Sequence, residues 1–295
     1  MRARTLLLTT VLAGLVLLTA SAAPAGHPSL KCLIVDGQNN HNWRATTPVM
    51  KKILEDSGVF TVEVATSPGK KEDMSGFKPK FADYDVVLLN YNGKPWPDET
   101  NQAFLDYVKG GGGVVVVHAA DNAFGKWKEY NEIIGLGGWG GRNEKSGPYV
   151  YYKDGKPVRD TSPGRGGSHG PQYPIQIVAR KPNHPVMKGL PEKFMHSKEE
   201  LYHSLRGPAK NLTVLATALA EKKKRGTGRH EPALMDIRWG DGRCFHTVLG
   251  HSVTQMKSVA FIVTLQRGAE WAATGKVTQK VPDDFPTADE WQRRE

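Results

Sequence analysis

The chain has 295 residues, of which 39% are hydrophobic, with a formal net charge of +10 and 2 cysteines. This apolar content is too high for a disordered chain, and 2 cysteines are too few for a disulfide framework. The length fits one large α/β domain or two modest ones. The basic run Lys222–Arg225 has no interleaved aromatic residues, so we interpret it as a solvated loop and expect no nucleic-acid partner.

The N-terminus has the pattern of a secretory signal peptide. Two arginines in Met1–Arg4 precede an apolar run from Leu6 to Leu18, and small residues follow. The run is shorter than the ~20 residues that span a membrane. We therefore expect residues 1–25 to be a signal peptide that is cleaved after Ala22 or Ala25, with a retained anchor as the alternative. The mature chain is predicted to be periplasmic or secreted, with no stable membrane span.

The first half of the chain is predicted to alternate strands with helices. Apolar or alternating runs indicate strands at Lys31–Val35, Phe60–Val64, Asp85–Asn90 and Val114–Val117. Helical patterns open at Thr46–Pro48 and end at Gly58, and cover Asp98–Lys109 and residues 126–134. This alternation is typical of a mainly parallel sheet with helices on both faces.

The middle of the chain differs in composition. Residues 135–174 are rich in Gly, Pro, Tyr and Arg and show little periodicity, so we expect long loops over the sheet, with an insertion at about residues 140–174. Strands then resume at Ile175–Ala179, Val214–Ala218, Ala233–Arg238 and Cys244–Leu249, followed by a helix from Ser258 to Ala273. We expect one domain over residues 30–275 and a loose tail over residues 276–295.

Both cysteines are expected to be free, buried thiols. Cys32 and Cys244 each lie within an apolar run, where a small buried thiol is the simplest interpretation. Export would also permit a disulfide between them.

Histidines and polar residues follow several of the predicted strands. His41 follows the first strand, His118 ends the Val114–Val117 strand, and His251 comes after the Cys244–Leu249 strand. Because parallel strands present their carboxyl ends at one edge of the sheet, we expect these imidazoles to share a pocket there. Glu200, in a stretch that also holds Tyr202, is expected to fold back over the same edge. Such a His/Glu set either binds a divalent ion such as Zn²⁺ or acts as general acid and base without metal.

Five sequence motifs occur in an order that resembles the ThuA-like (trehalose-utilisation) family. They lie within residues 30–275: Val35–Trp43, Gly111–Ala120, Asn183–Pro191, Glu199–Tyr202 and Trp239–His251. The resemblance implies the flavodoxin-like, class I glutamine amidotransferase-like three-layer fold. It also implies a role in the use of trehalose or keto-sugar derivatives.

One position departs from the amidotransferases of that fold. They carry a nucleophilic Cys at a strand-to-helix elbow, where this chain has His118, and neither cysteine is close in sequence. The thiol for a glutaminyl thioester is therefore missing, and we expect no glutaminase activity.

Two classes of function follow from these expectations. The first is an exported enzyme that acts on a sugar or keto-sugar glycoside, with His41, His118, Glu200 and His251 as its catalytic residues or, if a metal is present, its ligands. The second is a non-catalytic carbohydrate-binding or scaffold protein. Aromatic residues that could stack on sugar rings are Trp43, Trp96, Trp139 and Tyr202. The expected substrate contacts are Asn40, Trp43, Asn90, Asp121, His184 and Tyr202.

Overall fold

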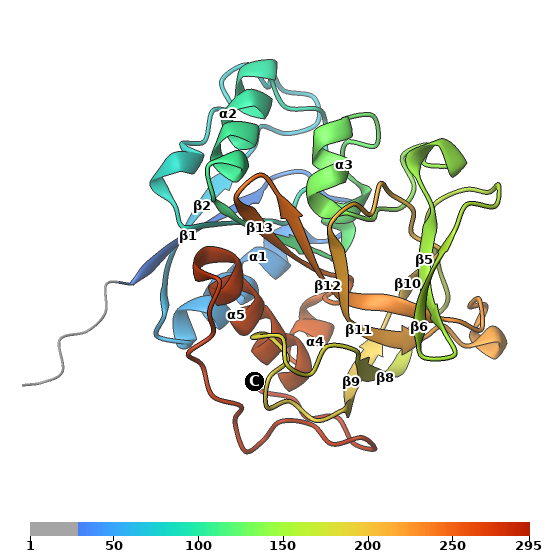
Figure 1. Ribbon diagram of the computed structural model, residues 1–295. Helices are drawn as coiled ribbons and strands as arrows, with labels where there is room; N and C mark the ends of the chain where they lie inside the picture. The colour runs from blue at the N-terminus through green and yellow to red at the C-terminus, as the bar shows by residue number, and fades with distance from the viewer. Residues whose placement is uncertain (1–28) are drawn as a thin grey trace, which may run out of the picture.

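The computed structural model describes residues 29–295 and has the expected α/β architecture. One large sheet runs through the molecule, with helices packed on both of its faces (Figure 1). The signal-peptide prediction for residues 1–25 lies outside the described residues. Among the described residues, no helix has both the length and the apolar character needed to cross a membrane.

The parallel half of the sheet carries the edge at which the site forms. Its strands follow the spatial order β2, β1, β3, β4 and β13, and all neighbouring pairs are parallel. Their bounds are β1 (Leu30–Asp36), β2 (Phe60–Thr66), β3 (Val86–Leu89), β4 (Gly113–Val117) and β13 (Gly242–Thr247). Because β13 runs parallel to β4, the segment that follows it reaches the same edge as those after β1 and β4. The expected position of His251 at this edge required that orientation.

The second half of the sheet is antiparallel. It continues through β12 (His230–Trp239), β11 (Leu212–Leu219), β8 (Tyr173–Ala179) and β9 (Lys193–Glu199). Sequence patterning located β8, β11 and β12 but missed β9. The sequence of β9, KFMHSKE, contains few apolar residues, and several of its buried positions are polar. A strand that buries His196, Ser197 and Glu199 gives no hydrophobic alternation to detect.

Helices cover the two faces of the sheet (Figure 1). The α-helices are α1 (Trp43–Asp56), α2 (Asp98–Lys109), α3 (Lys128–Ile134), α4 (Val253–Met256) and α5 (Val259–Thr274), and the 3₁₀ helices are η1 (Phe81–Asp83), η2 (His118–Asn122), η3 (Glu144–Ser146) and η4 (Lys222–Lys224). Helix α1 begins earlier than predicted because the side chain of Asn42 accepts a hydrogen bond from the Ala45 amide and caps the helix.

The insertion is more ordered than its composition predicted. It contains a hairpin of β5 (Tyr149–Lys153) and β6 (Lys156–Asp160), and β7 (Ser168–His169) pairs with β10 (Tyr202–His203). Asp154 and Gly155 form the hairpin turn with positive φ angles, which is a recognised turn signal. The expectation of structureless loops is therefore corrected.

Two buried arginines organise the loops around that hairpin. The guanidinium of Arg142 donates to the carbonyls of Gly138 and Ala123, and that of Arg206 donates to Ser162 and Gly147. A buried charged donor with several carbonyl acceptors fixes loops that have no hydrophobic periodicity.

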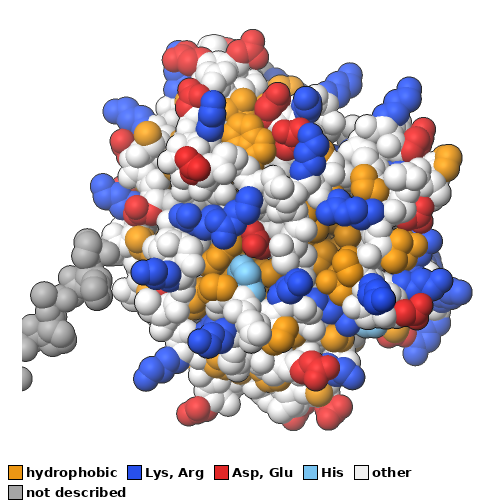
Figure 2. All heavy atoms as spheres, in the orientation of Figure 1, with side chains coloured by type: hydrophobic (Ala, Val, Ile, Leu, Met, Phe, Trp, Pro, Cys, Tyr) orange, Lys and Arg blue, Asp and Glu red, His pale blue; other side chains and the backbone are white. Residues whose placement is uncertain are grey.

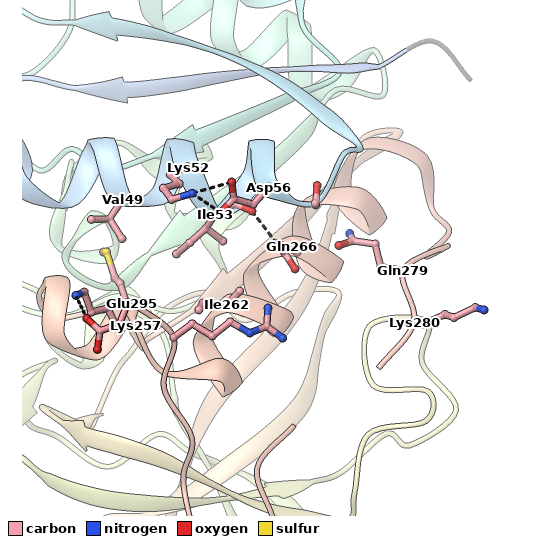
Figure 3. A pocket seen from close by; sticks show the side chains of 13 residues that line it. Val49, Lys52, Ile53, Asp56, Lys257, Ile262, Gln266, Gln279, Lys280 and Glu295 are labelled. Atoms are coloured by element: carbon pink, nitrogen blue, oxygen red, sulfur yellow. Dashed lines mark hydrogen bonds and ion pairs between the residues drawn. The ribbon is translucent and has the colours of Figure 1, made fainter. Parts of the chain in front are cut away.

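The C-terminal tail is held against the domain rather than loose. The carbonyl of Thr287 accepts a hydrogen bond from the amide of Met195, and that of Gln292 accepts one from Val259. Between the tail and helices α1, α4 and α5 lies a cavity of about 520 Å³. Figure 3 shows the side chains that line it, with apolar groups such as Val49 and Ile262 beside charged and amide groups such as Lys52 and Gln266.

The two cysteines agree with the sequence prediction. Cys32 and Cys244 are both free and buried, as expected. On the face shown in Figure 2, Asp and Glu side chains stand among the Lys and Arg side chains.

Candidate functional site

Four side chains from distant parts of the chain meet at the carboxyl edge of the parallel strands. His41, His118, Glu200 and His251 each offer one ligand atom, and these atoms all lie within 4.8 Å of one another. His41 follows β1, His118 follows β4, and His251 follows β13. The structure therefore brings these four residues together, as the sequence predicted.

One carboxylate oxygen lies at the centre of this cluster. Oε2 of Glu200 is 3.9 Å from Nε2 of His41, 3.9 Å from Nε2 of His118 and 4.0 Å from Nε2 of His251. These separations exceed a hydrogen bond, which is about 2.7–3.2 Å long between such atoms. Three ring nitrogens thus face one oxygen without bonding to it directly.

The tautomer of His118 is set by its backbone partner. Its Nδ1 lies 2.6 Å from the carbonyl oxygen of Val248, and a carbonyl can only accept, so Nδ1 carries the proton. The lone pair is then on Nε2, which is buried without a partner. Burial lowers the pKa of His118 to about 4, so the imidazole is neutral at pH 7 and suited to ligate a metal.

The backbone at His118 forms the elbow that the sequence predicted. His118 has a φ of +45° where β4 turns into η2, a conformation that is uncommon for a non-glycine residue and is often found at functional sites. Both cysteines lie within strands, and burial raises their pKa values. This elbow therefore presents an imidazole, and the buried thiols are held in their protonated form.

The pKa values of His251 and Glu200 are also shifted by their surroundings. Burial lowers the pKa of His251, which favours its neutral form. Burial alone would raise the pKa of Glu200, but the neighbouring imidazoles of His41 and His251 outweigh it and hold this pKa below its ordinary value. At His118 and His251 burial thus favours the neutral imidazole, and the pKa of the Glu200 carboxyl is lowered, which are the directions that favour binding of a divalent cation.

His169 is a member of the site that sequence reasoning missed. It comes from β7 within the insertion, and its Nδ1 lies 3.1 Å from Oε1 of Glu200. It is more exposed than the four clustered residues and lies at the cavity mouth. A lone histidine in a Gly-rich stretch without periodicity carries no signal that could have placed it here.

Aromatic rings form one wall beside the cluster. The ring of Tyr202 lies over His118 with centroids 4.0 Å apart, and Trp139 contacts Tyr202 edge-on at 4.7 Å. Burial raises the pKa of Tyr202, so its phenol stays protonated at neutral pH. Together they give an apolar ring surface next to polar groups, the combination that sugar rings bind.

The cavity that these residues enclose measures about 580 Å³, within the range of about 300–1,000 Å³ for small-molecule sites. Its lining residues are Asn40, His41, Lys70, Asn92, Asn122, Trp139, His169, Glu200, Tyr202 and His251. Asn40 and Tyr202 are thus at the cavity, as expected.

Four of the residues expected to contact substrate do not line this cavity. Asn90 donates to the hydroxyls of Thr46 and Thr47, which holds the start of α1. Asp121 is fully buried, 3.5 Å from Nε2 of His246. These two side chains support the site from behind it.

Trp43 and His184 point elsewhere. Trp43 stacks with the guanidinium of Arg44 at the start of α1. His184 pairs with Asp236 at 3.4 Å and packs on Trp271 of α5. Trp96, expected as a stacking residue, is buried in the aromatic core. Their positions were misjudged because sequence proximity to a strand end does not fix side-chain direction.

The comparisons with known proteins identify the family. The family model described as "ThuA: Trehalose utilisation" matches residues 31–272.

The chain belongs to the ThuA family.

Solved structures of ThuA-like proteins share its fold. One from Parabacteroides merdae is 53% identical, with a TM-score of 0.88, and the match covers 90% of this chain and 98% of that one. A second, from Bacteroides uniformis, is 20% identical with a TM-score of 0.58, covering 87% of this chain and 97% of that one. A comparison with the curated proteins found no match. The ThuA family assignment agrees with the motif resemblance and the α/β fold.

Proposed function

We propose that this ThuA-family protein is an exported, divalent-metal-dependent enzyme that acts on a sugar or keto-sugar glycoside. The metal ligands are Nε2 of His41, His118 and His251 together with the carboxylate of Glu200. The observation that carries the proposal is the convergence of four ligand atoms within 4.8 Å. Export rests on the charged, apolar and small-residue pattern of residues 1–25.

The geometry favours a metal over a metal-free acid–base network. Ligand atoms about 2.0–2.1 Å from a tetrahedral Zn²⁺ lie about 3.4 Å from one another. The separations between Glu200 Oε2 and the three imidazoles are wider, at 3.9–4.0 Å, and all four ligand atoms lie within 4.8 Å of one another. A direct hydrogen-bonded network would bring these atoms closer than this. Three nitrogens and one oxygen are also an ordinary ligand set for Zn²⁺ and its neighbours in the first transition row.

The cavity supplies the features that sugar binding needs. Trp139 and Tyr202 offer ring faces, while Asn40, Asn92 and Asn122 offer amide donors and acceptors for hydroxyl groups. A bound divalent ion would polarise a sugar carbonyl or hydroxyl. The family description, trehalose utilisation, agrees with a carbohydrate substrate.

We assign proton transfer in the proposed reaction to His169, at the outer edge of the site. An oxidised sugar has an acidic C–H beside its carbonyl, so a base could isomerise it or eliminate a glycoside from it. His169 lies at the cavity mouth, in contact with Oε1 of Glu200 and outside the four ligands. It can therefore exchange protons with both the carboxylate and a substrate in the cavity.

The test combines metal binding with turnover. We expect purified mature protein to hold one divalent ion per chain, measured by elemental analysis, and Glu200→Gln to hold much less. His230→Ala is the matched control, since His230 lies on β12 and contacts Thr217 outside the cluster. A screen of glycosides and their keto forms then tests turnover. Equal metal content in wild type and Glu200→Gln would refute the proposed ligand set.

A second function, carbohydrate binding without catalysis, is favoured by the amide-rich lining around Trp139. It predicts saturable sugar binding with no product from any glycoside or keto-glycoside in the screen. Binding of that kind would persist after metal is removed with a chelator.

A further inference from the structure

We propose that Glu199, a buried carboxylate directly behind the cluster, is the positioning residue and counter-charge of the metal site. The inference rests on the proposed metal site and deepens it. Glu199 is fully buried, with 0% of its surface exposed. Glu199 does not line the cavity, so it cannot contact a substrate and acts through the residues around it.

The Glu199 carboxylate fixes the backbone of two metal ligands at once. Its Oε1 accepts hydrogen bonds from the amides of Glu200 at 2.9 Å and His251 at 3.3 Å. Its Oε2 accepts one from the amide of Gly250 at 2.7 Å. The end of β9 and the loop after β13 are thereby held in one arrangement, which sets where the side chains of Glu200 and His251 begin.

The carboxylate is itself held in place. Nε2 of His196 donates to Oε2 of Glu199 at 3.0 Å, and Nδ1 of His196 lies 3.0 Å from the hydroxyl of Ser258, the N-cap of α5. All of these groups are buried. Gly250 has a φ of +103°, and a Cβ there would lie 2.7 Å from the ring of Phe261. The loop shape that presents the amides to Glu199 therefore depends on glycine.

The charge balance gives Glu199 a second role. Three neutral imidazoles and one carboxylate around a divalent cation leave one positive charge, and an unpaired buried charge is costly. An ionised Glu199 brings the total to zero. Four N–H groups face its two oxygens, those of the His196 ring and of the Glu200, Gly250 and His251 amides, and such a set of donors favours an ionised carboxylate.

The variant Glu199→Gln keeps the shape of the side chain but removes its charge. It also turns one acceptor into an amide donor that must face an N–H group. Outer-shell partners of metal ligands are worth about 10–100-fold in metal affinity. We expect Glu199→Gln to lower the affinity for Co²⁺, used as a spectroscopic probe, by about that factor, and to change the visible absorption of bound Co²⁺.

Glu270→Gln is the matched control. Glu270 is also buried, at 3% exposure, and accepts from the backbone and side chains of Thr278 and Gln279. It belongs to α5 and holds the start of the tail, with no contact to the metal ligands. Both variants remove a buried charge, so both lose stability. We expect only Glu199→Gln to alter the Co²⁺ affinity and spectrum.

Three further results decide the proposal. Wild-type Co²⁺ affinity and spectrum in a folded Glu199→Gln would overturn it. If that variant does not fold, His196→Gln, which keeps the Glu199 charge, should still weaken Co²⁺ binding, and unchanged binding would overturn the positioning role. If wild type binds no metal, the proposed function fails. The positioning role can then be tested without metal, because Glu199→Gln should speed the hydrogen exchange of the Gly250 and His251 amides. Exchange rates equal to those of the wild type would overturn that role.

Discussion

The Nδ1 atom of His118 lies 2.6 Å from the carbonyl oxygen of Val248, and this contact determines which ring nitrogen faces Glu200. It joins the elbow after β4 to the segment after β13, the two neighbouring parallel strands. Since the carbonyl accepts the Nδ1 proton, Nε2 is left as an unprotonated nitrogen beside Glu200. One backbone contact thus both stabilises the elbow and leaves Nε2 free for the metal ligation that we propose.

Because the His118 ring has these two roles, two variants can distinguish loss of the proposed metal ligand from loss of the hydrogen bond to Val248. In His118→Asn, the side-chain amide can take the place of Nδ1 and donate to Val248, but no group replaces Nε2. We expect loss of metal with little change in the free energy of unfolding. His118→Ala also leaves the buried Val248 carbonyl unpaired, which costs ~1–3 kcal/mol more. Urea unfolding and metal analysis of both variants provide the check, and retained metal in His118→Asn would contradict the ligand assignment.

Glu231 gives a prediction about pH. Burial raises the pKa of Glu231 to about 7, against 4.5 for the ordinary carboxyl group. Between these values the folded state binds more protons than the unfolded state, so this residue lowers stability as pH rises from about 4.5 to 7. Glu231→Gln removes the titration. Relative to wild type, we expect the variant to gain stability between pH 4.5 and pH 8, by about 3 kcal/mol at most.

Urea unfolding of wild type and Glu231→Gln at several pH values measures that difference directly. Other titrating groups contribute equally to both proteins and cancel. A pH-independent difference would show that Glu231 titrates at the same pH in the folded and unfolded states.

Glutamine hydrolysis is predicted to be absent. Neither Cys32 nor Cys244 lies at the elbow, and burial raises the pKa of both thiols, so no thiolate is available there. Ammonia release from glutamine by the purified protein should equal the rate without protein. A rate above that level that His118→Ala abolishes would contradict the prediction.

Export is predicted with removal of the first 22–25 residues, on the sequence pattern of the N-terminus. Intact-mass measurement of periplasmic or secreted material should give a chain that begins after Ala22 or Ala25. Soluble protein that still carries Met1–Ala22 would rule out cleavage.

The sequence could predict the three histidines of the cluster because strand topology places them, whereas Glu200 was expected from a segment that folds back over the same edge. His41, His118 and His251 each follow a buried parallel strand closely, and such strands end at one edge. His169 could not be predicted, because it lies on a two-residue strand whose position depends on pairing with Tyr202 and His203. Glu199 gave no sign of its role either, since its partners, Gly250 and His251, are far from it in sequence.

The sequence predicted the fold less well in the segments whose buried side chains are polar. Strand β9 buries His196 and Glu199 and so lacks an apolar alternation. The loops near the insertion are fixed by Arg142 and Arg206, which bond to carbonyls that no sequence pattern identifies. Hydrophobic periodicity predicts elements that are stabilised by apolar packing, and it fails where buried hydrogen bonds organise the chain.

The most direct test of the metal site is anomalous diffraction at the zinc edge, from crystals of the mature protein grown with Zn²⁺. We predict one strong peak about 2.0–2.2 Å from Nε2 of His118 and His251 and from the Glu200 carboxylate, with His41 completing the set. The peak should be much weaker in Glu200→Gln crystals grown in the same way. Well-ordered crystals with no peak at the cluster, or with an equal peak in Glu200→Gln, would contradict the account.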